Sequence, residues 1–163
     1  VAVTVATAGF SVAVNDRANT MKRIKGGVKY TIASLVELPK LRRYPVSMTL
    51  DGVEHNIEAN VIAVANTRYF GGGMKIAPNA VLNNGQLDVV VIGPAPRLAF
   101  AVLLPTIFSG RHIASRYVTV HRASKIEFAG AALDLRADGE TFGAMPTTLT
   151  VRPQSLLVAG LDI

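Results

Sequence analysis

Residues 46–58 have the sequence VSMTLDGVEHNIE, and this stretch decides the fold class. Apolar and polar side chains alternate on both sides of Asp51-Gly52, as they do in strands that bury one face. An Asp-Gly pair supplies the positive φ angles of a type I′ turn, which connects adjacent antiparallel strands. The stretch therefore predicts a β-hairpin.

More strands are predicted on the C-terminal side of this hairpin. The nearly continuous apolar runs 60–66 and 87–92 are typical of buried central strands. Turn signals recur at short spacing from residue 44 onward, which indicates a β-sandwich or a β-barrel. The shorter strands are expected over residues 117–121, 125–128, 133–136, 148–152 and 155–158.

The first 43 residues predict one strand and a broken helical hairpin. Val1–Thr7 is rich in Val and Thr and favours a strand. Asn15 or Asp16 is expected to cap a helix, which Gly26-Gly27 interrupts. Residues 28–38 resume an apolar helical pattern and end at a proline.

A further helix is predicted over residues 96–108, closed by Ser109-Gly110. Pro105 predicts a kink or an early end, because proline lacks the N–H that a helix interior needs. The uncharged stretch Leu98–Gly110 has 13 residues. That is fewer than the roughly 20 residues that span a bilayer, so no transmembrane helix is expected.

Composition and charge narrow the function. With 163 residues, half of them hydrophobic, the chain has the length of one domain and enough apolar material for a core. It contains no cysteine, which excludes a disulfide scaffold, a cysteine-ligated metal and a thiol nucleophile. The formal charge of +6 favours anionic partners: phosphate-bearing ligands, membrane surfaces or nucleic acid. The chain opens in an apolar run without a signal-peptide pattern, which favours a start at a domain boundary and a cytoplasmic or membrane-peripheral location.

Two local features are candidates for chemistry. Gly71-Gly72-Gly73 would let backbone N–H groups approach a phosphate and form an anion-binding nest, although a wide turn is the favoured interpretation of the triplet alone. Asp138 and Glu140 flank a glycine and would point to one side of an extended segment. Two such carboxylates can bind Mg²⁺ or take a proton from a hydroxyl. The alternative is a simple Asp-Gly turn, like Asp51-Gly52.

The histidines and the basic clusters indicate function less clearly than these two features do. His55, His112 and His121 lack the spacing of a metal site, and His112 is expected to cap a helix end. Two basic clusters, Lys22-Arg23-x-Lys25 and Lys40-x-Arg42-Arg43, flank the predicted helical hairpin. They face either an anionic membrane or solvent, and the two interpretations are equally supported.

Taken in order, five segments resemble the catalytic family of diacylglycerol kinases, in particular the soluble bacterial enzymes and the related sphingosine and ceramide kinases. The segments are residues 66–78 (NTRYFGGGMKIAP), 82–89 (LNNGQLDV), 110–112 (GRH), 137–140 (ADGE) and 151–153 (VRP). The resemblance covers essentially the whole chain, and an ordered set of motifs is far more specific than any one of them.

The resemblance implies an antiparallel β-sandwich with helical insertions, in a mainly β domain. In this family a nucleotide-binding domain with a Gly-Gly-Asp-Gly-Thr loop comes first, and neither that loop nor the Gly-Thr-Gly-Asn-Asp signature occurs here. Residues 1–163 are therefore expected to form a single domain, the C-terminal, substrate-side domain of a two-domain lipid kinase. Without the N-terminal ATP-binding domain, the isolated fragment is expected to be inactive.

The resemblance also implies a reaction. The family transfers the γ-phosphoryl group of ATP to a lipid hydroxyl, giving phosphatidic acid from diacylglycerol, with Mg²⁺ on the phosphates. Its acidic pair corresponds to Glu140, expected to be the base, and Asp138, expected to support the base or the magnesium. The loop from Arg68 to Lys75, with Gly71, Gly72 and Gly73, is expected to face a phosphate or lipid headgroup beside this pair.

The family's Mg²⁺-binding turn corresponds to residues 83–88. The resemblance implies the backbone carbonyls of Val81 and Gln86 and the side chain of Asn84 as ligands. Asn84 stands where the family has aspartate. An amide oxygen can bind a hard cation but brings no charge, so a weakened metal site is expected.

Two alternatives stay open from the sequence. One is the matching domain of an NAD kinase-like enzyme, and the other is a stand-alone β-sandwich binding module without catalysis. For the lipid kinase, the expected partners are a lipid substrate and a membrane surface contacted peripherally. Nucleic acid is not expected, and a homodimer is one possible assembly.

Overall fold

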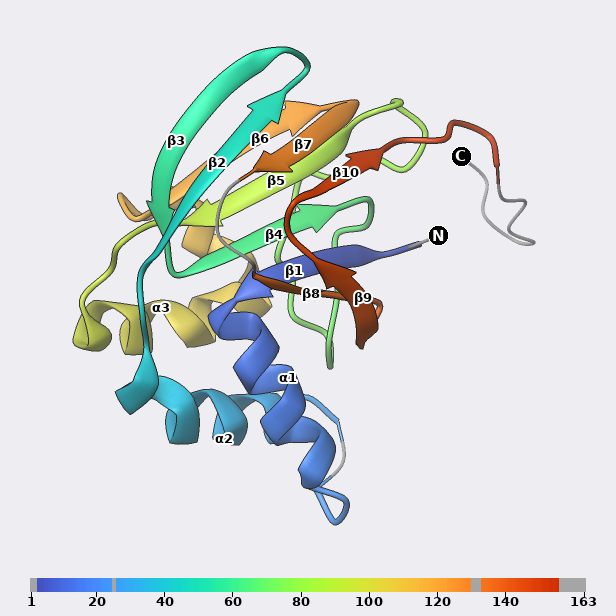
Figure 1. Ribbon diagram of the computed structural model, residues 1–163. Coiled ribbons are helices and arrows are strands. Elements are labelled where there is room, and N and C mark those ends of the chain that lie inside the picture. The colour runs from blue at the N-terminus through green and yellow to red at the C-terminus, as the bar shows by residue number, and fades with distance from the viewer. Residues whose placement is uncertain (1–2, 25, 130–132, 156–163) are drawn as a thin grey trace.

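A computed structural model describes residues 3–24, 26–129 and 133–155, which form two antiparallel sheets and a layer of helices (Figure 1). The larger sheet has the strand order β6-β5-β4-β1-β8-β9, and the smaller one has the order β10-β7-β2-β3. The larger sheet contains β1 (Val5–Gly9), β4 (Val61–Ala65), β5 (Leu87–Ile92), β6 (Val118–Ala123), β8 (Asp134–Ala137) and β9 (Glu140–Ala144). The smaller sheet contains β2 (Tyr44–Leu50), β3 (Val53–Ala59), β7 (Lys125–Ala129) and β10 (Thr147–Thr150).

The helices lie on the face of the larger sheet that points away from the smaller sheet (Figure 1). They are α1 (Phe10–Thr20), α2 (Val28–Glu37) and α3 (Arg97–Ser109), with the short 3₁₀ segments η1 (Leu38–Lys40) and η2 (Arg111–Ala114). None of the helices in the described part of the chain has the length and hydropathy that crossing a bilayer requires.

Two layers of core follow from this arrangement. One layer fills the space between the sheets, with Met48, Ile126 and Phe128 on the smaller sheet facing Val89 and Leu135 on the larger. The other layer packs α1, α2 and α3 onto the larger sheet. Strand β4 lies between both layers, which is why all five of its residues are buried and why its sequence is apolar without alternation.

The predicted hairpin and the predicted β-sandwich are confirmed. Strands β2 and β3 pair antiparallel with Leu50 opposite Val53. Asp51 has φ 46° and Gly52 has φ 91°, the two positive values of a type I′ turn. The fold is mainly β, with the helical segments inserted between strands.

The N-terminal prediction is wrong in its boundaries. Of the strand predicted over Val1–Thr7, residues 1–2 fall outside the described residues, and residues 3–4 are not in a strand; β1 covers Val5–Gly9, and α1 begins directly after it. Asn15 and Asp16 therefore lie inside α1 instead of capping it. A tertiary contact starts this helix: the Phe10 N–H donates to the Asn60 carbonyl at 2.9 Å, and the Phe10 ring packs edge-on against Phe100.

Helix α3 continues through Pro105 to Ser109 and ends at Gly110, so the early end does not occur. Its buried face, formed by Phe100, Leu103 and Ile107, packs on the core on both sides of the proline. This burial outweighs the hydrogen bond that proline cannot make.

Three predictions near the C-terminus are also corrected. The exposed strand β9 was not predicted, because its residues show no apolar alternation. Strand β10 ends at Thr150 instead of residue 152. Ser155 lies outside any strand, and the remainder of the predicted strand 155–158 falls outside the described residues.

The histidines have structural surroundings that the sequence did not indicate. His112 is fully buried in η2, and its Nε2–H donates to the Ile76 carbonyl at 2.9 Å rather than capping α3. Burial lowers the pKa of His112. His121 lies within β6, and its ring meets that of His55 from the other sheet at 4.9 Å between centroids.

Candidate functional site

A largely apolar cavity of about 290 Å³ lies between the larger sheet and the helices. Its apolar wall comes from all three helices, from β1, β4 and β5, and from the glycine loop. The principal apolar side chains are Phe10, Val14, Tyr30, Val61, Phe70, Met74, Ile76, Ile92, Phe100, Leu104 and Ile107. The cavity therefore has the character of a site for a hydrocarbon group.

Polar groups gather on one part of the wall, where β8 and the turn after it meet α1. Thr4, Asn15, Arg136, Asp138 and Gly139 all line the cavity. Hydrogen bonds join them: the Asn15 amide donates to the Gly139 carbonyl at 3.0 Å, and Asp138 accepts from Thr4. The wall thus combines a large apolar surface with a few converging polar groups, as ligand sites usually do.

The segment Asp138-Gly139 is a hairpin turn and not an extended strand. Asp138 has φ 53° and Gly139 has φ 88°, and the turn joins Ala137 of β8 to Glu140 of β9. The expectation that both carboxylates point to one side of an extended segment is therefore wrong in its geometry. The alternative, an Asp-Gly turn, is the structure that forms, because positive φ at two successive residues reverses the chain.

The Asp138 carboxylate is held by the chain that precedes β1. It accepts hydrogen bonds from the backbone N–H of Val3 at 2.7 Å, Thr4 at 2.8 Å and Val5 at 3.3 Å, and from the Thr4 hydroxyl. Burial raises the pKa of Asp138, but the hydrogen bonds from Thr4, Val3 and Val5 together outweigh it and hold the pKa below its ordinary value. Asp138 is therefore ionised at neutral pH, and its carboxylate already accepts hydrogen bonds from residues 3–5.

Glu140 differs from Asp138 in every one of these respects. It is exposed at the start of β9. No hydrogen bond or ion pair to its carboxylate occurs within residues 3–24, 26–129 and 133–155. Glu140 follows Gly139 in the chain but does not itself line the cavity.

Part of the glycine loop lies on the cavity wall. Phe70, Gly71 and Met74 line the same cavity as Asp138 and Gly139. Phe70 and Met74 pair with each other across the loop, with the Phe70 N–H donating to the Met74 carbonyl at 2.9 Å. The triplet also has a packing reason: a Cβ on Gly72 would lie 2.7 Å from Gly27 Cα, so only glycine permits this approach.

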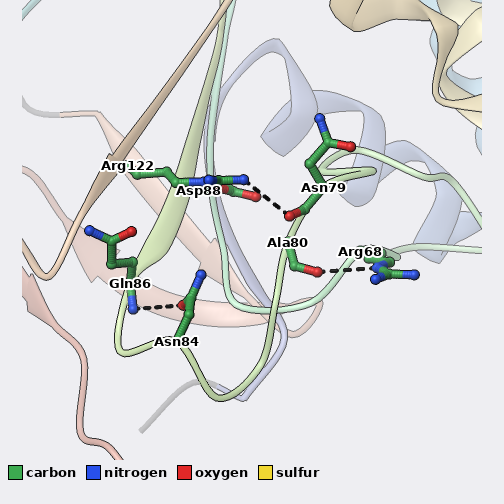
Figure 2. Close-up of polar contacts among 7 residues, drawn as sticks. All are labelled: Arg68, Asn79, Ala80, Asn84, Gln86, Asp88 and Arg122. Carbon is green, nitrogen blue, oxygen red and sulfur yellow. Dashed lines mark hydrogen bonds and ion pairs between the residues drawn. The ribbon is translucent and has the colours of Figure 1, made fainter.

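The cationic ends of the loop do not line the cavity. Arg68 Nε donates to the Ala80 carbonyl at 3.1 Å (Figure 2), and Lys75 Nζ lies 5.7 Å from the centre of the Tyr69 ring. The structure thus brings Gly71 to the candidate site and leaves Arg68 and Lys75 outside the cavity wall. A phosphate-binding role for Arg68, Gly71, Gly72, Gly73 and Lys75 stays a prediction.

Residues of the predicted metal-binding turn form hydrogen bonds and an ion pair with other protein groups (Figure 2). The Asn84 side-chain oxygen accepts a hydrogen bond from the Gln86 N–H at 2.9 Å. Asp88, the acid of this turn, is buried and pairs with Arg122 at 2.8 Å, and Arg122 also donates to the Asn79 carbonyl at 3.2 Å. Among the described residues, no three His, Asp or Glu side chains form a cluster that could hold a metal ion.

These contacts do not fit a Mg²⁺ ion bound by Val81, Asn84 and Gln86. Mg²⁺ prefers carboxylate oxygens and retains several waters. Here the amide of Asn84 is neutral and used within the turn, and the charge of Asp88 is neutralised by Arg122.

One residue of the wall was missed by the sequence analysis. Arg136 lines the cavity two residues before Asp138, and its Nη2 pairs with Asp16 of α1 at 2.9 Å. Arg136 is the last residue of the strand predicted over residues 133–136, and its position two residues before Asp138 was visible in the sequence. The apolar wall could not be found in that way, because its residues come from six separate elements.

Comparisons with known proteins cover nearly the whole chain. Residues 4–160 match the family described as the YegS C-terminal NAD kinase beta sandwich-like domain. A diacylglycerol kinase of Mycobacterium tuberculosis (strain H37Rv) is 37% identical over 156 residues, which are 95% of this chain and 50% of that protein. A Shewanella frigidimarina protein named "Probable lipid kinase YegS-like" is 29% identical over 156 residues, 94% of this chain and 50% of that protein.

Solved structures agree on the fold. A candidate diacylglycerol kinase from Bacillus anthracis (strain Sterne) superposes with a TM-score of 0.64 at 19% identity, over 91% of this chain and 50% of that one. At this identity the likeness concerns the fold alone. The chain spans about half the length of the curated relatives it matches.

Proposed function

The chain belongs to the family of YegS C-terminal NAD kinase beta sandwich-like domains, and from that premise we propose that it is the lipid-binding half of an ATP-dependent kinase that phosphorylates diacylglycerol. The observation that carries the proposal is one apolar cavity whose wall includes the Asp138-Gly139 turn. The names of the relatives, diacylglycerol kinase and YegS-like lipid kinase, support the same class of reaction.

In this proposal the cavity takes an acyl chain. Its volume of about 290 Å³ is close to the small end of ligand cavities, which are roughly 300–1,000 Å³, so it suits one slender group. Each methylene group removed from water contributes about 0.8 kcal/mol to binding. The polar part of the wall would then hold the glycerol end of the lipid beside Glu140.

Glu140 is the proton acceptor in the proposed reaction. The lipid hydroxyl gives its proton to Glu140 while its oxygen forms a bond to the γ-phosphorus of ATP, and the bond from that phosphorus to ADP breaks. Asp138 holds the turn that presents Glu140, through its bonds to residues 3–5. ATP, with the Mg²⁺ that accompanies it in kinases, is assigned to the part of the protein beyond this chain.

The helical layer is the proposed contact with the membrane that holds the lipid. Its helices expose large apolar side chains, among them Leu98 at 79% and Val102 at 66% on α3, and Val28 at 62% and Leu35 at 55% on α2. The segments that carry the helices, residues 10–43 and 94–116, contain eleven of the 17 basic residues and two of the 11 acids. One of those acids, Glu37, is buried and paired with Arg17 and Lys40.

Such a surface fits the headgroup region of an anionic bilayer on the cytoplasmic side. Apolar side chains enter the boundary between headgroups and acyl chains, while each Lys or Arg near an anionic surface adds about 1 kcal/mol of attraction. The membrane contact and the acyl-chain cavity therefore share one side of the molecule, the side of the helices.

The reaction is tested with the full-length protein, labelled ATP, and diacylglycerol or NAD as acceptor. Leu104→Trp would fill the cavity and is expected to lower diacylglycerol phosphorylation at least 10-fold. Val53→Trp, an exposed position on β3, is the matched control and should leave the rate within 2-fold. Phosphorylation of NAD in place of lipid, or no effect of Leu104→Trp in a folded protein, would overturn the proposal.

The membrane contact is tested by co-sedimentation with vesicles. Binding to phosphatidylglycerol vesicles should exceed binding to phosphatidylcholine vesicles and should weaken as salt rises. Val102→Asp is expected to lower the bound fraction several-fold, whereas Val53→Asp should not change it. Equal binding of both variants would show that α3 does not face the bilayer.

A further inference from the structure

Two hydroxyl groups of the cavity wall have no hydrogen-bond partner among the described residues. They belong to Thr7 of β1 and Ser34 of α2, which both line the cavity and are each 6% exposed. Within residues 3–24, 26–129 and 133–155, the unpartnered side-chain atoms with almost no accessible surface are Asp88 Oδ2, His112 Nδ1 and Arg136 Nε. The two hydroxyls are not among these atoms, so both reach the open space of the cavity.

The strand pattern of β1 explains why Thr7 faces the cavity. Side chains alternate along a strand, so Ala6 and Ala8 enter the core between the two sheets. Val5 and Thr7 face the helices instead. Thr7 stands opposite Arg136 of β8 in the antiparallel register, so it adjoins the polar part of the wall, where the glycerol end of the proposed lipid would lie.

Ser34 reaches the cavity from the helical side. It follows Tyr30, another residue of the wall, by one turn of α2. A serine in a helix commonly donates to a carbonyl three or four residues earlier. Ser11 of the same wall does so, to the Ala8 carbonyl at 3.2 Å, whereas Ser34 makes no such bond among the described residues. The hydroxyl proton of Ser34 is therefore available to a ligand.

A hydroxyl in a largely apolar wall costs free energy unless a partner satisfies it. A plain hydrocarbon chain offers neither a donor nor an acceptor, so it would displace water from both hydroxyls and leave them unpaired. A ligand with oxygen atoms at these two places avoids this cost. The wall therefore favours a lipid whose polar atoms enter the cavity together with part of its chain.

From these contacts we infer that Thr7 and Ser34 determine specificity for an acyl ester. Their hydroxyls donate hydrogen bonds to ester carbonyl oxygens of the acylglycerol, which are acceptors without a proton of their own. A lipid with ether-linked chains has no carbonyl at these places and binds more weakly. The inference rests on the proposed function, because it assumes that a lipid occupies the cavity.

The charges of the wall favour a neutral group at this site. Its charged residues are Arg136 and Asp138, and both have partners within the protein. Arg136 pairs with Asp16, and Asp138 accepts hydrogen bonds from the N–H groups of residues 3–5. A phosphate or ammonium group would exchange its hydration for two neutral hydroxyls, which costs far more than burying an ester.

The test measures binding to the full-length protein in mixed micelles, by displacement of a fluorescent diacylglycerol analogue. The competitors are dioctanoylglycerol and its dioctyl ether analogue, which lacks both carbonyls. The wild-type protein is expected to bind the ester at least 10-fold more tightly than the ether. Thr7→Val and Ser34→Ala should each reduce this preference about 5-fold, the effect of one neutral hydrogen bond, by weakening the ester alone.

Matched variants separate ligand recognition from structure. Ser11→Ala removes a hydroxyl of the same wall whose proton is already used, and Thr119→Val removes one from an exposed position on β6. Both should leave the preference for the ester within 2-fold of wild type. The Tm of ligand-free Thr7→Val and Ser34→Ala should stay the same or rise, because neither hydroxyl has a protein partner to lose.

Each outcome has one meaning. If the probe and both competitors fail to bind the wild-type protein, the proposed function fails. If they bind but Thr7→Val and Ser34→Ala keep the wild-type preference, the inference fails and the proposed function stands. Equal weakening of ester and ether would show that the hydroxyls only shape the cavity, and a lower Tm of both ligand-free variants would show that they hold the fold. Both of these results overturn the inference.

Discussion

Two Asp-Gly turns in this protein have the same local structure and different surroundings. Asp51-Gly52 has φ angles of 46° and 91°, and Asp138-Gly139 has φ angles of 53° and 88°. Each turn closes an antiparallel hairpin, and in each the aspartate side chain accepts hydrogen bonds from the backbone of a distant segment. The comparison separates what an Asp-Gly sequence determines from what its place in the fold adds.

The partners of the two aspartates show a shared structural role. Asp51 accepts from the backbone N–H and hydroxyl of Ser124 and from the Lys125 N–H, so it holds the junction of β6 and β7. Asp138 accepts from the N–H groups of residues 3–5 and holds the chain that enters β1. Asp51 therefore does more than form a turn, since its carboxylate ties the β2–β3 hairpin to the junction of β6 and β7.

The two Asp-Gly turns differ in the part of the molecule that surrounds them. Asp138-Gly139 lines the cavity and is followed by the exposed Glu140, whereas Asp51-Gly52 is exposed and followed by Val53. A catalytic role for the Asp138-Gly139 turn would thus depend on the neighbouring cavity and on Glu140. The geometry of the turn alone does not indicate such a role.

The largest expected effect is on turnover. Glu140→Gln in the full-length protein should lower lipid phosphorylation by about 10²–10⁴-fold, because the amide cannot accept the proton. Thermal stability should not change, since the Glu140 carboxylate makes no described contact. Glu58→Gln, another exposed glutamate at the end of a hairpin strand, is the control and should keep turnover within 2-fold. Normal turnover in Glu140→Gln would remove the assigned base.

The next effect compares the two aspartates directly. Asp138→Asn should lower turnover about 10²-fold, because a shift of the turn by about 1 Å misplaces Glu140. Asp51→Asn breaks similar bonds far from the cavity and should leave turnover within 2-fold. The rate of phosphatidic acid formation measures both. If the two variants lose turnover equally, the loss reflects folding rather than the site.

A smaller effect is expected from the glycines of the two turns. A Cβ at Gly52 or at Gly139 would have no neighbour within 4 Å, so only the positive φ angle opposes alanine. Gly52→Ala and Gly139→Ala should each destabilise the protein by about 1–2 kcal/mol. Urea unfolding measures this cost, and clearly unequal costs would mean that the turns are not equivalent local structures.

The smallest effect is the pH dependence of stability. Hydrogen bonds from the Ser124 and Lys125 N–H groups and the Ser124 hydroxyl lower the pKa of Asp51, and the bonds to residues 3–5 outweigh burial and lower that of Asp138. Carboxylates with a lowered folded-state pKa stabilise the protein above their unfolded value of about 3.9, and this stability is lost as the pH falls through the folded-state pKa.

The Tm should therefore fall below about pH 4, and Asp51→Asn and Asp138→Asn should each flatten that fall while lowering Tm at pH 7. Differential scanning calorimetry from pH 2 to pH 7 measures both changes. An Asp51→Asn protein with the wild-type curve would contradict the structural role assigned to Asp51.

Several elements were predictable because they depend on neighbouring residues. Alternation around Asp51-Gly52 predicted β2 and β3, and the apolar runs predicted β4 and β5 within one or two residues. The resemblance predicted that the glycine loop lies near the Asp138 turn, and parts of both line the same cavity. The residue at which α1 begins was not predicted, because it depends on the hydrogen bond from the Phe10 N–H to the carbonyl of Asn60, which lies fifty positions further along the chain.

Part of the candidate site could not be predicted from neighbouring residues in the sequence. Strand β9 is exposed and carries no alternation, so only its pairing with β8 makes it a strand. The cavity wall gathers residues from Thr4 to Gly139. Arg136 is held on the wall by contacts with Asp16 of α1 and Thr141 of β9.

The sequence by itself indicated the β-sandwich, the β2–β3 hairpin and the motifs of a lipid kinase family. Backbone geometry explains this, since turn residues and apolar periodicity act over a few positions. The tertiary structure alone decided that one Asp-Gly turn faces a cavity and the other solvent. It also decided that Asp138 accepts hydrogen bonds while the Glu140 carboxylate has no partner among the described residues, and that Asp88 of the segment 81–88 pairs with Arg122. Those properties arise from contacts between segments such as those of Thr4 and Asp138, which lie 134 residues apart in the sequence and come together only in the folded protein.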